Sequence, residues 1–99
     1  MEKVSLTFDD FENLLNTNIK IRFENNITLD SELIELEKLP KYSEFSGQPF
    51  YFILRTLQTT EYYQQATYLL LHPTKGEIPV FLVPLGLDHI GMKYQAIFN

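Results

Sequence analysis

Two histidines are the residues of this chain best suited to acid–base chemistry or metal binding. His72 and His89 are its only histidines, and imidazole is both the side chain that titrates near neutral pH and a common metal ligand. A metal site would need them together with Asp88 or Glu77, and their spacing matches no ligand pattern. His72 precedes Pro73 in a turn-forming segment, where an imidazole can bond to local backbone. We therefore interpret His72 as structural and expect no metal or cofactor.

Sequence patterns of other catalytic sites are absent from the chain. It has no cysteine, and it lacks a Gly-x-Ser-x-Gly motif, a phosphate-binding glycine loop and a dinucleotide fingerprint. The carboxylate pairs Asp9/Asp10 and Glu35/Glu37 fit a helix start and the solvent side of a strand. A glycosidase would need two acids facing one cleft, which local sequence does not show. We predict that the protein is not an enzyme.

Tyrosines are the side chains that most favour binding, because each joins a flat apolar ring to a polar tip. The candidates for a sugar or protein contact are Tyr42, Tyr51, Tyr62 and Tyr63. In the alternative interpretation, one or two of these rings close the core and the rest are exposed singly. The predicted interaction surface consists of Tyr62, Tyr63, Ile78 and Pro79.

The composition predicts a single globular domain over residues 1–99. Hydrophobic residues make up 44% of the chain and aromatic residues 14%, which is enough for one core and favours a sheet. Without cysteines there is no disulfide framework, thiolate metal site or cysteine nucleophile. No stretch resembles a signal peptide or approaches the roughly 18 apolar residues of a membrane span, so we expect a cytoplasmic protein without membrane contact.

The net charge of −5 is unevenly distributed. Residues 1–50 carry ten acidic and five basic side chains, whereas residues 51–99 carry three of each. No basic patch is available to displace counterions from phosphates, so the pattern disfavours nucleic-acid binding.

Residues 68–84 predict the β-hairpin around which the fold is organised. Two apolar runs flank a five-residue turn segment that contains His72, Pro73 and Gly76. Proline suits the second position of a type I turn, and glycine suits the left-handed position that follows it. Pro79 and Pro84 interrupt the second run and cannot donate to a ladder, so residues 78–83 are predicted to form an edge strand or one bulged at Pro79.

The remaining segments predict a helix and four further strands. Thr7 and Asp10 have capping-box spacing and open a helix of about 8–10 residues. Residues 18–24 alternate as a half-buried strand, and Asn25-Asn26 predicts a two-residue hairpin turn. The next strand changes phase, which predicts a β-bulge or a sharp bend near residues 31–34. Residues 49–57 are apolar on both faces and predict a covered central strand, residues 58–65 a polar loop, and residues 92–98 a last strand. The fold class is mainly β: a six-stranded antiparallel sandwich or small barrel with one short N-terminal helix.

The C-terminal half resembles a family of small bacterial proteins catalogued as a domain of unknown function. The resemblance is carried by Gln65-Ala66-Thr67-Tyr68, His72-Pro73, Gly76-Glu77, Phe81-Leu82-Val83-Pro84, Gly86, Gly91 and the Tyr94-x-Ala96-x-Phe98-Asn99 ending, together with Pro49-Phe50. It covers residues 49–99 well and the first half in its apolar spacing. Leu57-Gln58-Thr59 stands where a turn with Gly-Pro is expected. The resemblance brings no catalytic residues, and it implies a gene that lies near phage-tail-like or tail-fibre genes.

Two functions remain open at this point. The first is a non-catalytic β-domain that acts through protein–protein contact, with a partner or with itself, as an accessory of a tail-like or surface assembly. The second is a small-ligand or carbohydrate-binding module that uses the tyrosines and the loop over residues 85–91, which requires at least two converging rings.

Overall fold

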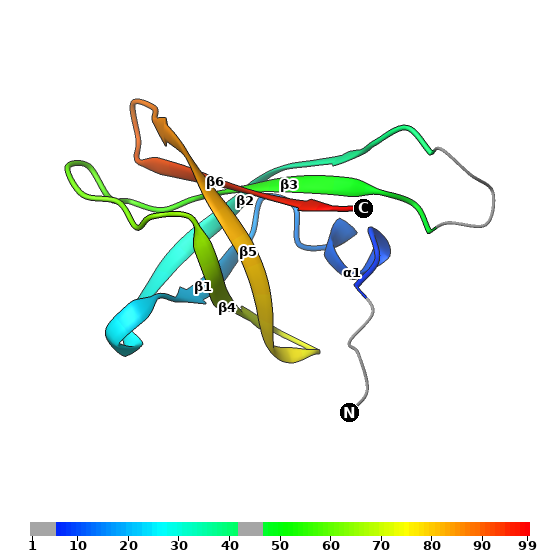
Figure 1. Cartoon of the computed structure of the whole chain (residues 1–99), viewed down its shortest axis with the longest axis horizontal. Helices are drawn as coiled ribbons and strands as arrows, with labels where there is room; N and C mark the ends of the chain where they lie inside the picture. Colours follow the sequence, from blue (N-terminus) through cyan, green and yellow to red (C-terminus); the bar gives the residue numbers. More distant parts are fainter. Residues whose placement is uncertain (1–5, 42–46) are drawn as a thin grey trace.

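The computed structural model describes residues 6–41 and 47–99, and within them it is mainly β with one short helix, as predicted (Figure 1). The elements are α1 (Asp9–Glu12), β1 (Asn18–Arg22), the short 3₁₀ turn η1 (Glu24–Asn26), β2 (Thr28–Lys38), β3 (Phe50–Arg55), β4 (Ala66–His72), β5 (Gly76–Leu87) and β6 (Met92–Phe98). The strands form a closed barrel, so of the two predicted architectures the barrel is the one observed.

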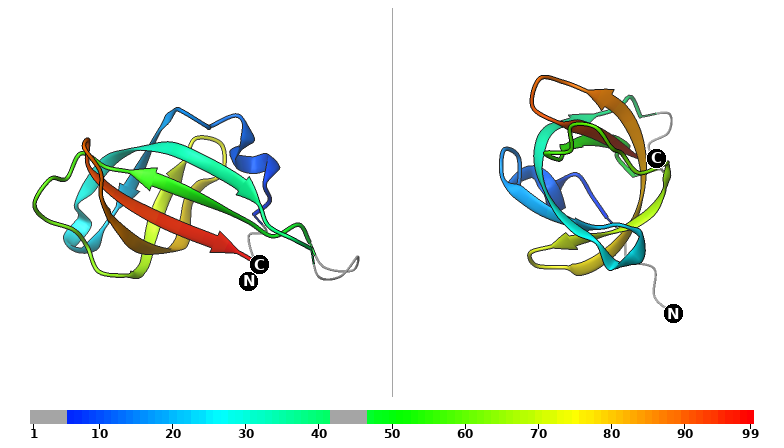
Figure 2. Two further views of the ribbon diagram at one scale, coloured as in Figure 1. Left: turned by 90° about the horizontal axis from the view of Figure 1, so that it is seen from above. Right: turned by 90° about the vertical axis from the view of Figure 1, so that its left-hand side faces the viewer.

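The barrel order is β1-β2-β3-β6-β5-β4, and every neighbouring pair is antiparallel. The first three strands follow one another as hairpins, and β4 then returns to lie beside β1, which is a Greek-key arrangement. Viewed end-on, the strands curve around a common axis (Figure 2, right). This closure leaves no terminal edge strand.

Inward-facing side chains of all six strands fill the barrel. On β3, for example, Phe50, Phe52 and Leu54 are buried and their neighbours are half-buried. This strand was predicted to be covered on both faces. It is central, since it pairs with β2 and β6, but its outer face is partly exposed because nothing packs over it among the described residues.

The helix α1 is shorter than the predicted 8–10 residues. It has four residues, and the chain leaves it through turns in which Leu14 and Thr17 donate backbone hydrogen bonds to the carbonyls of Phe11 and Leu14. The N–H of Asn16, which has a φ of 67°, then donates to Leu33 O at 2.7 Å. This bond to β2 fixes the chain for entry into β1 and ends the helix early.

Two local predictions about β2 have different outcomes. The bulge is confirmed, because Leu33 pairs with Leu54 and Glu35 with Ile53, which leaves Ile34 as the extra residue. The β1–β2 turn contains the two expected asparagines at positive φ, 60° for Asn25 and 59° for Asn26. It is longer than the two residues predicted, since η1 adds Glu24 to the turn.

The β4–β5 hairpin is confirmed, but β5 is not an edge strand. Pro79 pairs with Leu69 in continuous register, and the irregularity lies between Pro84 and Gly86 instead of at Pro79. The proline is accommodated because β6 pairs only with residues 83–87 of β5. At the level of Pro79, no strand on that side requires its missing N–H.

Candidate functional site

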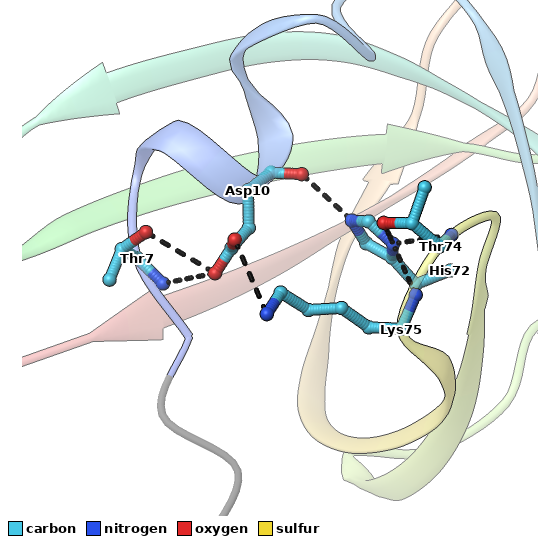
Figure 3. Close-up of polar contacts among 5 residues, drawn as sticks. All are labelled: Thr7, Asp10, His72, Thr74 and Lys75. Atoms are coloured by element: carbon cyan, nitrogen blue, oxygen red, sulfur yellow. Dashed lines mark hydrogen bonds and ion pairs between the residues drawn. The ribbon is translucent and has the colours of Figure 1, made fainter.

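The first candidate site is the contact between α1 and the β4–β5 turn, where His72 lies. The backbone N–H groups of Thr74 and Lys75 each donate to His72 Nδ1 at 3.2 Å. His72 Nε2 lies 2.7 Å from the carbonyl oxygen of Asp10 (Figure 3). Because Nδ1 accepts, Nε2 must carry the proton and donate to Asp10. Both ring nitrogens of a neutral imidazole are therefore in use.

The surroundings of His72 are also structural. Its ring is buried and meets the Phe11 ring edge-on at a centroid distance of 5.4 Å. Lys75 Nζ lies 3.5 Å from an Asp10 carboxylate oxygen, to which the Thr7 N–H donates at 2.8 Å. Burial raises the pKa of Asp10, but the Thr7 N–H and the Lys75 charge outweigh it, and the net shift is downward. In Figure 2 (left) α1 lies beside the yellow turn, so this cluster fastens the helix to the barrel.

A second polar cluster lies among the buried side chains where the chain crosses from β3 to β4. The Tyr94 hydroxyl donates to Gln58 Oε1 at 2.7 Å and accepts from the Tyr63 N–H at 3.0 Å. The Thr56 hydroxyl donates to the same Gln58 oxygen at 3.0 Å. Burial raises the pKa of Tyr94 above its usual range. The hydroxyl is held as a neutral donor, which suits a structural network.

Asp88, a residue considered as a metal ligand, is occupied by protein donors. Its carboxylate accepts the N–H groups of Ile90 at 2.8 Å and Gly91 at 2.9 Å, and Arg55 Nη1 lies 2.9 Å away. The N–H of Gly91, followed by that of Ile90 and by the Arg55 guanidinium, holds the pKa of Asp88 well below its usual range. Across residues 6–41 and 47–99, no group of three His, Cys, Asp or Glu side chains could hold a metal ion.

A hollow of about 490 Å³ lies where α1 meets the ends of the strands, and two of its polar lining groups, Gln48 and Lys38, contact neighbouring protein groups. Gln48 Nε2 donates to the carbonyls of Leu39 and Pro49, both at 2.8 Å. Lys38 Nζ lies 4.9 Å from the centroid of the Phe8 ring. The contacts of Gln48 and Lys38 are therefore structural, and we assign no ligand to this hollow.

The outer surface of β4, β5 and β6 is the other candidate, and we call it the β5 face. Along each strand its residues alternate with residues that point into the barrel, and the residues at its centre are mainly apolar. Phe81 is 53% exposed and Ile97 is 55% exposed, while Glu77 and Lys93 mark its two ends. The β5 face comprises Thr67 and Leu69 of β4, Pro79, Phe81 and Val83 of β5, and Gln95 and Ile97 of β6.

The predicted interaction residues do not form one surface. Tyr62 is 59% exposed and lines a hollow of about 240 Å³ with Leu85 and Met92. Tyr63 instead stacks on Phe23 with centroids 4.2 Å apart. Ile78 is buried in the barrel, so its assignment to a surface is wrong: it alternates inward next to the outward Pro79.

The described candidates Tyr51, Tyr62 and Tyr63 do not converge on one ligand site. Tyr51, on β3, donates its hydroxyl hydrogen bond to Glu35, and this bond raises the pKa of Tyr51. Tyr62 and Tyr63 lie in the loop before β4, where Tyr62 is exposed and Tyr63 stacks on Phe23. Tyr42 lies outside the described residues.

Phe81 and Ile97 were missed by the sequence interpretation. The signal was available, since residues 78, 80 and 82 alternate with residues 79, 81 and 83 and one set must face outward. Because both sets are apolar, the sequence could not show which one fills the core.

Comparison with known proteins identifies a family for this chain but assigns no activity to it. A family model described as "Domain of unknown function (DUF6916)" matches residues 6–98. No curated protein and no solved structure matches the chain. In the part of the chain that the structure describes, no helix has the length and apolar character needed to cross a membrane.

Proposed function

The chain belongs to the family of domains of unknown function DUF6916, and we propose that it is a non-catalytic β-barrel module that acts through protein–protein contact. The contact surface is the β5 face, and its central residue is Phe81. The exposed apolar side chains of this face are the single observation that carries the proposal.

Phe81 lies at the middle of an apolar strand surface, and more than half of its side chain is outside the core. At about 200 Å² for a whole aromatic side chain, its 53% exposure corresponds to about 100 Å² of apolar surface in water. Ile97 of β6 is exposed to a similar extent, and Leu69 and Val83, which lie on the same side of the sheet as Phe81, are half-buried. Apolar patches mark interaction sites more often than scattered apolar residues do.

The hydrogen bonds of the candidate catalytic side chains, His72 and Asp88, support the proposal of a non-catalytic protein. A catalytic site needs a nucleophile or base with access to substrate. Here both His72 nitrogens bond to backbone, and the Asp88 carboxylate bonds to Gly91, Ile90 and Arg55. The alternative of a carbohydrate module depends on converging tyrosine rings, and Tyr51 and Tyr62 lie on separate elements. The tail-like or surface assembly that the resemblance implies stays a prediction.

A charge placed on the β5 face tests this proposal. Phe81→Glu should abolish or weaken, by about tenfold or more, the binding of any protein that uses the face. Ile27→Glu is the matched control, because Ile27 is 43% exposed in the β1–β2 connection, away from the face. The readout is retention of purified candidate proteins, this chain included, on immobilised wild type and both variants. Equal retention by Phe81→Glu and Ile27→Glu would contradict the proposal.

A further inference from the structure

We infer that the occupant of the β5 face is a second copy of this chain, docked about a two-fold axis that passes near Phe81. The inference rests on the proposed function and adds the identity of the partner. Three observations carry it: the distribution of charge, the positions of Glu77 and Lys93, and the proline on β5.

The β5 face is a place where two copies can meet without bringing like charges together. Each chain carries a net charge of −5, so contact through most of its surface brings like charges together, which costs free energy. The acidic side chains on α1, η1 and β2 are Asp9, Asp10, Glu12, Glu24, Asp30, Glu32, Glu35 and Glu37. The seven residues of the β5 face are uncharged. A basic partner would instead prefer the acidic surface.

Glu77 and Lys93 give this face a charge pattern that is complementary to the same face of a second copy. Glu77 precedes Phe81 by four residues on β5, and Lys93 pairs with Gly86, beyond Phe81 in the other direction. The Glu77 carboxylate accepts from Arg22 Nη1 at 2.7 Å within its own chain, and its side chain is still 54% exposed, so a second cation can reach it. At about 3.3 Å per residue, each lies roughly 13–16 Å from Phe81 along the strand. A two-fold axis in the plane of the contact, perpendicular to β5 and level with Phe81, places Glu77 of each copy opposite Lys93 of the other.

Lys93 lacks a carboxylate partner in the part of the chain that the structure describes. No described carboxylate lies within 4.0 Å of its ammonium group. Its cross-strand neighbour is Arg55, another cation, which bonds to Asp88 at 2.9 Å and lies 3.5 Å from Glu32. A carboxylate supplied by the second copy would offset this like-charge pair.

Pro79 favours packing of the two faces over pairing of strand edges. Residues 76–82 of β5 have no β6 partner on one side, which would otherwise invite a strand from another molecule. Proline cannot donate to such a ladder and is one of the devices that protect exposed edges. Its ring is exposed beside Phe81 and adds apolar area to the face.

The area predicts a weak, reversible dimer. The exposed parts of the face sum to on the order of 400 Å² per copy, inside the range of functional surface patches. That is below the roughly 800 Å² per partner of a standard stable interface. Dimerisation should therefore be detected between about 10 µM and 1 mM protein.

Charge reversal tests the two-fold arrangement directly. In sedimentation velocity over that concentration range, Glu77→Lys and Lys93→Glu should each weaken dimerisation about threefold to tenfold, since each places like charges opposite one another. Lys93→Glu is the cleaner single variant, because Glu77→Lys also removes the ion pair with Arg22 in its own chain. The double variant Glu77→Lys/Lys93→Glu should restore the wild-type dissociation constant to within about twofold. Circular dichroism should show the same folded spectrum for all of these surface variants.

Three outcomes would overturn the inference: a wild type that stays monomeric to about 1 mM, a double variant no stronger than the weaker single variant, or a dimer insensitive to Phe81→Glu. A wild-type monomer whose binding to another protein is lost in Phe81→Glu would overturn the second copy as occupant and leave the proposed function standing. A monomer with no Phe81-dependent binding to any tested protein would overturn both.

Discussion

Gly91 lies directly against the backbone of Thr56. A side-chain carbon added at Gly91 would overlap the Thr56 carbonyl oxygen and lie 2.8 Å from its carbonyl carbon. This approach lets the Thr56 N–H donate to Met92 O at 2.9 Å, where the chain leaves β3 and β6 begins. The two residues are far apart in sequence, and their contact fixes the end of the barrel where the β3–β4 crossing starts.

Gly91→Ala should destabilise the protein by about 3 kcal/mol or more, because backbone has to move to admit the methyl group. Gly47→Ala is the control, since a Cβ there would meet nothing within 4 Å, and it should change stability by less than about 0.5 kcal/mol. Urea unfolding followed by circular dichroism measures both. Equal midpoints for the two variants would refute the close approach.

Phe11→Ala should cost about 3–5 kcal/mol, the usual effect of emptying a buried aromatic site. Phe11 is fully buried, and its ring centroid lies 4.8 Å from that of Phe52 and 6.1 Å from that of Phe50. The control is Leu15→Ala, a 40% exposed residue after α1, which should cost less than about 1 kcal/mol. If chemical denaturation finds the two losses similar, Phe11 is not the core residue that its burial against Phe50 and Phe52 indicates.

His72→Ala should destabilise the protein by about 2–3 kcal/mol. The substitution removes the acceptor for the Thr74 and Lys75 N–H groups and the donor to Asp10, at a buried position. His89→Ala, at an exposed position in the β5–β6 loop, should be neutral within about 0.5 kcal/mol. Denaturant midpoints compare the two, and a neutral His72→Ala would remove the structural role assigned to His72.

Asp88 makes stability depend on pH in the acid range. Its pKa in the folded protein lies below the roughly 3.9 of an ordinary aspartate, because Gly91 and Ile90 donate N–H groups to the carboxylate and Arg55 faces it. Between the two pKa values the unfolded chain binds more protons, so this stabilisation is complete above about pH 5 and decreases as pH falls.

Asp88→Asn should therefore be less stable than wild type at about pH 7, and this difference should shrink at about pH 3. The comparison uses the thermal midpoints of both proteins at the two pH values. The pH-dependent contributions of the other carboxylates to stability cancel in the difference, because both proteins contain these groups. If the difference between the two thermal midpoints stays constant or grows on acidification, the pKa of Asp88 is not lowered in the folded protein.

Local sequence rules predicted the features of the fold that depend on neighbouring residues. The phase change in β2 required a bulge, which is present at Ile34, and the turn chemistry around Pro73 and Gly76 placed the β4–β5 hairpin correctly. Gly76 has the expected left-handed backbone, with a φ of 77°. These features are set by alternation and by allowed φ values, which a short segment carries by itself.

Features set by distant contacts could not be predicted. The helix ends early because Asn16 bonds to Leu33 on another element. Pro79 looked like an edge marker, and the closed barrel accommodates it because β6 diverges at that level. The β5 face was missed for the same reason: which side of residues 78–83 is buried depends on closure of the barrel, which no local pattern specifies.

Cross-linking at Thr67 tests the central claim that the β5 face is a contact surface between copies. Thr67 pairs with Phe81 and points outward beside it, so the proposed axis brings it close to its own copy, and the chain has no native cysteine. At equal concentration under mild oxidation, Thr67→Cys should form disulfide-linked dimers at least about tenfold faster than the exposed control Ile27→Cys, in proportion to dimer occupancy. Equal cross-linking rates for the two variants would contradict the account.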